Sequence, residues 1–243
     1  MTVWTPSKLG ILSTAPAENE NGLVGRWCVD GTGSDWSGNG SNGSTVNGPV
    51  FPVSGIIGVG SNFNTTAYYS AKCTNPIITT YSAWVYLTSY SSSTVIFSCP
   101  GANSGYQFYV NSSTGKLQLD IQSTIAIGTS SGVVPQNVWS HVAVTYNNVT
   151  GVAIFYINGI SAGTATHTYS GTVSTTEYIG NYGGTRQQFL LNDARIYNRV
   201  LPNGEINAIY HQALSYQQGQ PEGEMPALYV APALRRLRSM VTS

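Results

Sequence analysis

The stretch "NDARIYNRVL", residues 192–201, decides the fold of this chain. It holds three charged side chains, Asp193, Arg195 and Arg199, although only 8% of the 243 residues are charged. A helical pattern follows directly after it. So much charge immediately before the only strong helical pattern raises the question of what these side chains do.

The segment after it, "PNGEINAIYHQAL" (202–214), predicts one helix. Pro202 suits its first turn, and Glu205 lies near the positive end of the helix dipole. We expect this helix to cover one edge or rim of a sandwich. Its apolar residues fall at helical spacing and form a single stripe: Ile206, Ile209, Tyr210 and Ala213.

The chain before this region divides into short strand-like runs separated by Gly, Ser, Thr and Asn. Several runs alternate or are rich in β-branched and aromatic residues, which is typical of an antiparallel sandwich or barrel. Asn158-Gly159 between two of them predicts a hairpin with a type I′ turn. The clearest runs are "SAWVYLT" (82–88), "TVIFS" (94–98), "GYQFYVN" (105–111), "KLQLDIQ" (116–122), "VWSHVAVTY" (138–146) and "VAIFYING" (152–159).

Composition excludes several classes of protein. Ten basic and ten acidic residues give a formal net charge of zero, which argues against a nucleic-acid binder with a broad basic face. No apolar run is long enough to span a bilayer. The three cysteines, Cys28, Cys73 and Cys99, are too scattered for a disulfide framework or a zinc site. We expect them to be small buried side chains, with one disulfide plus a free thiol as the alternative.

The two ends of the chain lack the strand-like sequence pattern of the middle. We predict an N-terminal arm over 1–22, the sandwich over 23–214, and a linker and docking tail over 215–243. Free ends of this kind usually fray, so we expect other structural proteins of an assembly to hold both. The tail would dock through apolar anchors and a rim of arginines, which are too few to bind nucleic acid alone: Leu228, Tyr229, Arg235, Arg236 and Arg238.

From Gly22 to about Gln212 the chain resembles the laminin-G-like, concanavalin A-like lectin/glucanase superfamily. The order and spacing of several segments carry the resemblance, and the last is the most specific. They are "GLVGRWCVDGTGSDWSGNGSNG", "GPVFPVSGIIGVGSNFN", "SAWVYLT", "VWSHVAVTYN", "IFYINGISAG" and "YIGNYGGTRQQFLLNDARIYNRVLPNGEINAIY".

The resemblance implies a jelly-roll sandwich of two antiparallel sheets in which the closing strand returns beside the opening strand. A buried arginine needs a carboxylate or several carbonyls to offset its desolvation. We therefore expect Arg195 or Arg26 to be held in this way, with Asp193 as a partner. Where the family often has two adjacent aspartates, this chain has Asn192-Asp193, which weakens the case for calcium.

Some members of the superfamily are glycoside hydrolases, which need two carboxylates flanking the scissile bond. Closely spaced acids occur here only in the predicted arm, at Glu18/Glu20, and in the linker, at Glu222/Glu224. Asp120 is alone in its run. "GTSSG" (128–132) matches a nucleophile-elbow pattern, but no helix follows, so we interpret it as a Ser/Gly turn. The chain is therefore predicted not to be an enzyme.

Calcium is the one cofactor that the sequence suggests. Its ligands are oxygens from carboxylates, amides and carbonyls in irregular loops. The loop "DGTGSDWSGNG" (30–40) offers Asp30, Asp35 and Asn39, and Asp193 would approach from the closing strand. In the alternative interpretation, Asp35 and Asn39 cap turns through bonds to backbone amides.

Sugar binding would use aromatic rings and amide side chains. The segment "IGNYGGTRQQ" (179–188) offers Tyr182, Arg186 and Gln187, although tyrosines on the solvent face of strands are equally ordinary in sandwiches. A surface poor in charge suits a protein exposed outside cells, yet the N-terminus lacks a secretory signal pattern. A phage virion protein assembled in the host cytoplasm reconciles the two.

We therefore predict a structural or display protein of a viral particle, such as a capsid decoration, fibre or tail-associated protein, that binds glycans or a host surface. A homo-oligomer is compatible with this role. The alternative is a carbohydrate-binding module of an extracellular or cell-surface protein, and a glycoside hydrolase is a weaker one.

Overall fold

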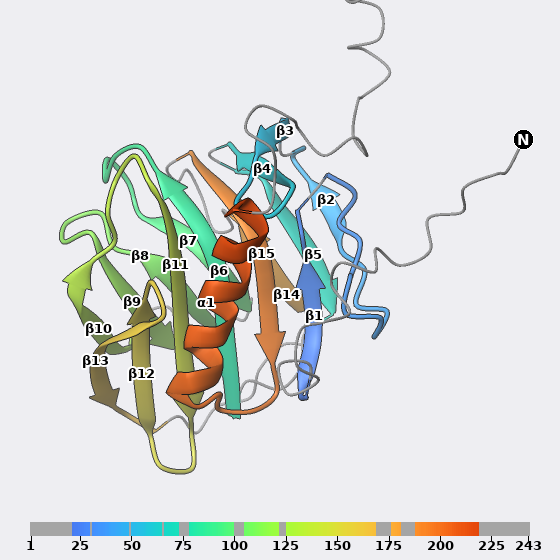
Figure 1. Cartoon of the computed structure of the whole chain (residues 1–243). Coiled ribbons are helices and arrows are strands. Elements are labelled where there is room, and N and C mark those ends of the chain that lie inside the picture. The colour runs from blue at the N-terminus through green and yellow to red at the C-terminus, as the bar shows by residue number, and fades with distance from the viewer. Residues whose placement is uncertain are drawn as a thin grey trace, which may run out of the picture.

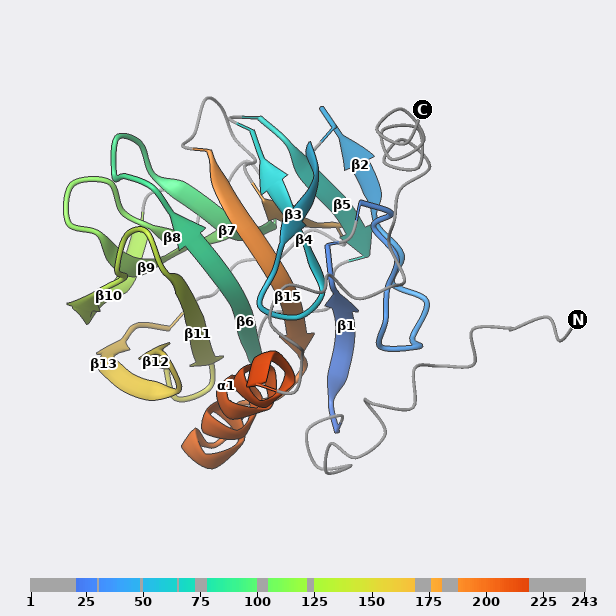
Figure 2. The ribbon, with the colours of Figure 1, turned by 45° about the horizontal axis from the view of Figure 1, so that its top comes forward.

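The structure is a computed structural model that describes residues 21–218, apart from residues 30, 49, 65, 73–77, 100–104, 122–124, 169–175 and 181–187. Two antiparallel sheets lie face to face, and one helix lies across the outer side of the larger sheet (Figures 1 and 2). The prediction of an all-β sandwich with one C-terminal helix is confirmed.

The larger sheet contains eight strands. Its order is β13 (Ile160–Thr166), β12 (Val152–Ile157), β11 (Trp139–Asn147), β6 (Ile78–Leu87), β15 (Phe189–Tyr197), β4 (Val59–Phe63) and β3 (Val50–Ser54), with β1 (Leu23–Trp27) paired to β15.

The smaller sheet contains seven strands. Its order is β10 (Ile125–Val133), β9 (Lys116–Ile121), β8 (Tyr106–Val110), β7 (Thr94–Cys99), β14 (Thr176–Gly180), β5 (Tyr68–Lys72) and β2 (Ser44–Val46).

The six strand-like runs all lie in strands, because their alternating apolar residues face the core between the sheets. The predicted hairpin joins β12 to β13, with positive φ at Asn158 (52°) and Gly159 (74°). The prediction of a Ser/Gly turn at "GTSSG" (128–132) is wrong, because this segment lies within strand β10. Irregular pairing of β10 with β9 between Thr129 and Val133 accommodates its small residues within the strand.

A single core fills the space between the sheets. Aromatic side chains dominate it, and burying each contributes roughly 1.5–3 kcal/mol. Cys28 and Cys99 are also buried, as expected, whereas Cys73 lies outside the described residues. The largest core residues include Trp27, Tyr69, Tyr81, Phe63, Phe97, Phe108, Phe155 and Phe189.

Strands β10 and β13, one at the edge of each sheet, lie against each other and close one side of the sandwich. Ser131 Oγ donates to the carbonyl of Ala162 at 2.9 Å. The close approach requires a glycine: a Cβ at Gly128 would lie only 2.2 Å from the Cβ of Ala165. The two edge strands therefore shield each other in part.

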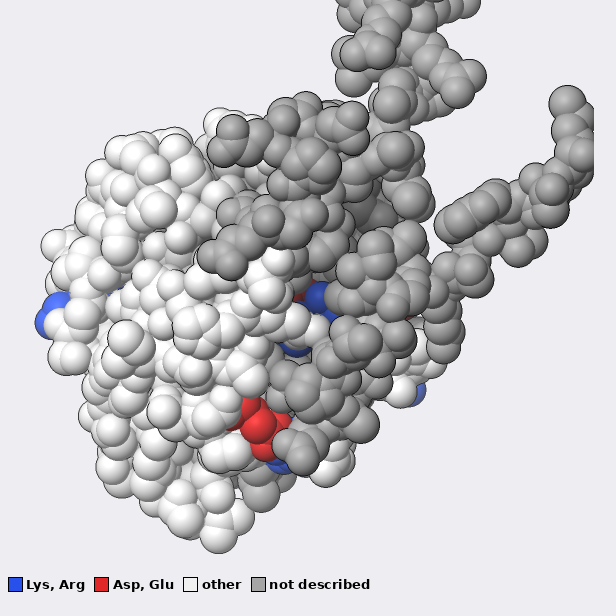
Figure 3. Space-filling view, in the orientation of Figure 1, with Lys and Arg blue, Asp and Glu red and all other residues white. Residues whose placement is uncertain are grey.

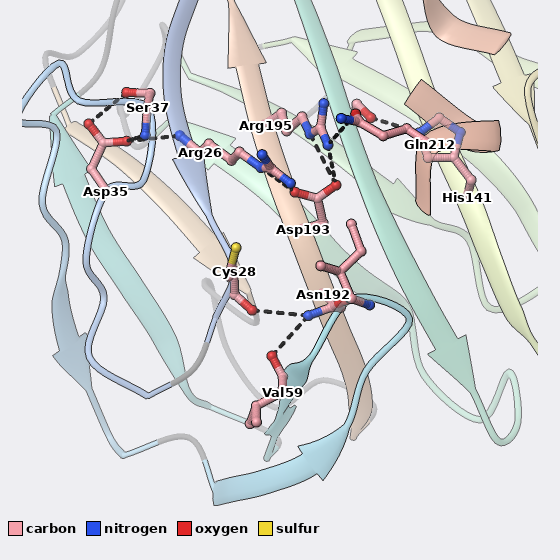
Figure 4. A network of polar contacts seen from close by, with 12 residues as sticks. Arg26, Cys28, Asp35, Ser37, Val59, His141, Asn192, Asp193, Arg195 and Gln212 are labelled. Atoms are coloured by element: carbon pink, nitrogen blue, oxygen red, sulfur yellow. Dashed lines mark hydrogen bonds and ion pairs between the residues drawn. The ribbon is translucent and has the colours of Figure 1, made fainter. Parts of the chain in front are cut away.

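Strand β15 contains Asp193 and Arg195 of the charged stretch and lies in the interior of the larger sheet. It pairs with β6 along one side, and with β4 and then β1 along the other. Its pairing with β6 is irregular between Asn192 and Arg195, where Asp193 has a φ of 48°. The bulge turns the side chain of Asp193 into the space between β1 and α1 (Figure 4).

Helix α1 spans Asn203–Gln218. The carbonyl of Pro202 accepts the first helical hydrogen bonds, from the amides of Glu205 (3.0 Å) and Ile206 (3.2 Å). The predicted stripe is confirmed, since Ile206, Ile209 and Ala213 are buried against the sheet.

The C-terminal boundary of the helix was predicted too early. Residues 215–218 belong to α1 rather than to a linker. The sequence allows this extension, because glutamine and tyrosine tolerate a helix and the next helix-breaking residue after Leu214 is Gly219. No helix among the described residues is long and apolar enough to cross a membrane.

Candidate functional site

The charged stretch forms a buried ion-pair network (Figure 4). Asp193 Oδ1 accepts from Arg26 Nε at 2.7 Å. Its other oxygen, Oδ2, accepts from Arg195 Nη2 at 2.7 Å and Nε at 3.0 Å. All three side chains are buried. The expected pairing of Arg26 or Arg195 with Asp193 is confirmed, and both arginines take part.

The network stays ionised because its members stabilise each other's charge. Burial alone would raise the pKa of Asp193, but the charges of Arg195 and Arg26 hold it well below its usual range. Asp193 in turn raises the pKa of Arg195 above its ordinary value, although burial opposes the shift. An anion between two cations inside the fold is suited to joining strands, not to catalysis.

Asn192 and Arg195 make further contacts with the chain after β1, with the start of β4 and with α1. Asn192 Nδ2 donates to the carbonyls of Cys28 and Val59, both at 3.0 Å, and its Oδ1 accepts from the amide of Ile57 at 2.8 Å. Arg195 Nη2 reaches Gln212 Oε1 on α1 at 3.4 Å. The stretch therefore connects β1, β4 and the helix to the closing strand, which explains why the charge is concentrated there.

The residues proposed for calcium are not brought together. Asp193 lies between two arginines, whose charges oppose a cation there. Asp35 Oδ1 accepts from the amides of Arg26 (3.0 Å) and Ser37 (2.9 Å), and Oδ2 accepts from Ser37 Oγ and the Ser41 amide, both at 2.8 Å. These contacts support the alternative role of Asp35 as a turn cap.

Asn39 differs from the predicted turn cap, because its Nδ2 donates to the carbonyl of Leu23 at 2.7 Å and so holds the loop against β1. Asp30 lies outside the described residues. No group of three or more His, Cys, Asp or Glu side chains in the described part of the chain could hold a metal ion. Calcium binding stays a prediction without a ligand set.

The other predicted site residues cannot be placed. Tyr182, Arg186 and Gln187 lie outside the described residues, as do Leu228, Tyr229, Arg235, Arg236 and Arg238 of the tail. The sugar-binding and docking interpretations of these residues therefore stay predictions.

His141 is a buried core imidazole. Its Nε2 lies 2.8 Å from Ser82 Oγ, and its ring packs beside Trp84 and Tyr210 of α1. Burial, followed by the nearby charge of Arg195, lowers the pKa of His141 to about 3, and Asp193 offsets part of the effect. The ring is neutral at physiological pH and serves the packing of α1 on the sheet.

A different surface gathers the side chains that can bind a ligand: the outer face of the seven-stranded sheet. One row of directly paired residues crosses five strands, from Ser70 through Tyr178, Ser98 and Gln107 to Asp120. Strands lie about 4.8 Å apart, so the row is about 19 Å long. Their sequence neighbours, such as Ile179 and Phe108, point into the core and hold the row in place.

Aromatic rings and amides flank this row. The rings of Tyr68 and Tyr178 pack at a centroid distance of 4.7 Å. Asp120 Oδ2 accepts from Tyr109 Oη and its Oδ1 from Gln118 Nε2, both at 2.7 Å. Except for Ser98, these side chains are half-buried. We call this surface the tyrosine–amide face, formed by Tyr68, Ser70, Ser98, Gln107, Tyr109, Gln118, Asp120 and Tyr178.

Ser98 is the residue of this face whose hydrogen bonding is incomplete. It is only 1% exposed, and among the described contacts its hydroxyl makes no hydrogen bond. A buried hydroxyl without a partner costs free energy. Asp120 is the one carboxylate among the described residues of the face, whereas glycosidic hydrolysis normally requires two.

Sequence alone missed this face but contained a signal for it. In the runs 105–111 and 116–122 the alternate positions Gln107, Tyr109, Gln118 and Asp120 are polar or amphipathic, which places them on one face. Tyr68 and Tyr178 lie beside these residues only because β14 pairs with both β5 and β7. Strand β14 is far from both of these strands in sequence.

Comparison with known proteins agrees with this architecture. A family model, Laminin_G_3, described as the concanavalin A-like lectin/glucanases superfamily, matches residues 60–207, more than half of the chain. No curated protein matches the sequence.

Many solved structures share the fold. Domain 4 of AbnA, a GH43 extracellular arabinanase from Geobacillus stearothermophilus, solved with arabinotriose, has a TM-score of 0.67 at 19% identity, covering 77% of this chain and 98% of that domain. The binding domain of Paraclostridial Mosquitocidal Protein 1 has a TM-score of 0.66 at 17% identity, covering 79% of this chain and 52% of that one.

A structure of botulinum neurotoxin type C, which depends on interaction with two ganglioside molecules to get into cells, has a TM-score of 0.65 at 15% identity, covering 81% of this chain and 52% of that one. This chain thus corresponds to the whole arabinanase domain but to only about half of the toxin binding domains. At these identities the likeness establishes the fold.

Proposed function

The chain belongs to the Laminin_G_3 family of the concanavalin A-like lectin/glucanases superfamily, and we propose that its sandwich is a non-catalytic carbohydrate-binding module. The tyrosine–amide face is the observation that carries this proposal. Amides, a carboxylate and hydroxyls match the alternating donors and acceptors of sugar hydroxyls, and tyrosine rings match their apolar C–H faces.

The ligand class follows from the dimensions and charge of the face. A row of about 19 Å accommodates an oligosaccharide better than a single sugar. Asp120 is the only carboxylate of the described face, and its oxygens already accept two hydrogen bonds. The face therefore suits a neutral glycan.

Two of the structural neighbours support a binding role. The arabinanase domain was solved with arabinotriose, and the type C neurotoxin interacts with gangliosides. Both ligands are or contain sugars. The whole length of the arabinanase domain matches this chain, so a separate module of this size is a reasonable unit of function.

A glycan array with the full chain tests the proposal, followed by titration of the best-bound neutral oligosaccharide, with arabinotriose included. We expect Gln107→Ala and Tyr178→Ala each to weaken binding by about tenfold, because each removes a direct contact. Thr164→Ala, an exposed change on β13 of the other sheet, is the matched control.

Two results would count against this function: a wild-type chain that binds no glycan, or binding that is unchanged in both variants. Release of reducing sugar from the bound glycan would contradict the non-catalytic part of the proposal.

We further propose that the terminal segments attach this module to an assembly such as a phage particle. This proposal rests on the composition of the segments 1–22 and 215–243, most of which lie outside the described residues. Deletion of 1–20 and 219–243 should leave the sandwich folded but abolish incorporation into an assembly. Incorporation of both truncated chains would contradict it.

A further inference from the structure

The loop between β1 and β2 presents an exposed tryptophan that neither the core nor the tyrosine–amide face uses. Trp36 is 49% exposed, and the other large hydrophobic side chains that are as exposed in the described part of the chain are aliphatic: Val133, Val138, Val149 and Ile160. An exposed indole presents a large flat apolar area that a ligand can cover.

The loop is held rigidly under this side chain. The Trp36 amide donates to the carbonyl of Arg26 at 2.7 Å, which fixes the loop beside the edge of β1. Asp35, its neighbour, accepts four hydrogen bonds from Arg26, Ser37 and Ser41. Those bonds lower the pKa of Asp35, although its burial opposes the shift.

Further contacts brace the loop on both sides of Trp36. Asn39 and Ser41 donate from their side chains to the carbonyls of Leu23 (2.7 Å) and Val24 (3.1 Å). The Asp35 amide donates to Asn42 Oδ1 at 2.9 Å. A loop backbone held in this way loses little conformational entropy on binding, which favours affinity.

The surroundings of Trp36 indicate the chemistry of its ligand. Residues 31–43 of the loop are Gly, Ser, Thr and Asn apart from Trp36 and Asp35, and Asp35 turns its carboxylate toward backbone amides. A hot spot for protein docking normally lies within a well-packed, desolvated patch. An isolated ring with a neutral rim of hydroxyls and amides instead matches the apolar face and hydroxyl edge of a sugar.

We propose that Trp36 is a stacking platform for a neutral sugar, a second glycan contact on the loop 31–43 outside the tyrosine–amide face. This inference rests on the proposed carbohydrate-binding function. The loop leads directly into β2, the edge strand of the sheet that carries that face. Two contacts on one rigid sandwich would raise its affinity for a polymeric glycan.

Titration of the full chain with the neutral oligosaccharide that binds best on a glycan array, and with the polymer of the same sugar, tests this proposal. We expect Trp36→Ala to weaken binding of the polymer by at least about tenfold and to reduce the ligand-induced change in the total tryptophan fluorescence of the chain. Trp36→Tyr, which keeps an aromatic ring, should stay within about threefold of the wild type. Val149→Ala, at a residue 77% exposed, is the matched control.

Binding of the polymer by Trp36→Ala within about twofold of the wild type would overturn the inference. If Gln107→Ala still weakens binding in that experiment, the proposed function stands without it. A wild-type chain that binds no glycan overturns both. Loss of adhesion to a protein-coated surface, with glycan binding unchanged, would make Trp36 a protein contact and would also overturn the inference.

Discussion

The closing-strand network and the tyrosine–amide face are both polar, but they differ in burial and in how their hydrogen bonds are used. In the network, Arg26, Asp193 and Arg195 are at most 8% exposed, and both oxygens of the carboxylate are occupied. On the face, Gln107 and Tyr178 are half-buried and stand in a row that spans several strands.

The difference shows that concentration of charge in a sequence does not mark a binding site. A buried charge must be paired within the protein, so it has little left to offer a ligand. Half-buried neutral groups exchange water for ligand at low cost, because water satisfies them in the free protein. In this fold the buried ion pairs therefore stabilise the sandwich, and the half-buried groups of the face, most of them uncharged, are suited to recognition.

Asp193→Asn should produce the largest loss of stability. It keeps the size of the side chain, and asparagine tolerates the positive φ of this position. It leaves two buried arginines without their anion, which typically costs about 3–5 kcal/mol. Urea unfolding followed by circular dichroism measures the change in the free energy of unfolding.

The matched control is Asp120→Asn on the tyrosine–amide face, where water can replace the lost interactions. We expect a cost below about 1 kcal/mol there. Equal losses at the two positions would remove the distinction between the two regions.

The second prediction concerns acid, through His141 beside the network. Its pKa is lowered to about 3 from 6.5, so the unfolded chain binds a proton more readily than the folded one. The stability associated with the neutral ring is complete above about pH 6.5 and is lost as the pH falls toward 3. Between pH 7 and pH 5 the loss is about 2 kcal/mol.

Urea unfolding at pH 7, 6 and 5 measures this loss, with His141→Gln as the comparison. Glutamine does not titrate, so the variant should lose less stability across the same range. Asp193 does not interfere, because its pKa is lowered and its contribution is lost only below its ordinary value of 3.8. The same pH slope in both proteins would show that His141 is accessible to protons in the folded state.

A third prediction places a partly exposed ion pair between the two extremes. Arg199 and Glu205 connect the chain after β15 to the first turn of α1, with Nη1 to Oε1 at 2.9 Å, and their side chains are 25% and 22% exposed. Glu205→Gln should cost about 0.5–1 kcal/mol, because solvent screens the pair. The cost should shrink in 1 M salt. A loss as large as that of Asp193→Asn would mean that solvent exposure does not determine how much each ion pair contributes to stability.

Sequence reasoning predicted the network better than the face for a physical reason. Asp193, Arg195 and the stripe of α1 are close in sequence, and burial of charge follows strict pairing rules, so their roles could be inferred. The row from Ser70 to Asp120 depends on the register of five strands, which no single segment encodes. Trp36 could be located as an aromatic in a loop, but its exposure depends on how Asp35 anchors that loop to β1.

The last prediction concerns the smallest expected loss of stability, and it tests whether the tyrosine–amide face is organised for binding. Tyr109→Phe removes one hydroxyl, which donates to Asp120 at 2.7 Å on a half-buried surface. The loss in unfolding free energy should be below about 1 kcal/mol, because water replaces the donor. Sugar binding should fall more than stability does, since Asp120 then loses one of the two groups that orient it. Parallel titration with the best-bound oligosaccharide and urea unfolding separate the two effects. Unchanged binding, with a stability loss above that of Glu205→Gln, would show that the hydroxyl serves the fold and that the two regions are alike.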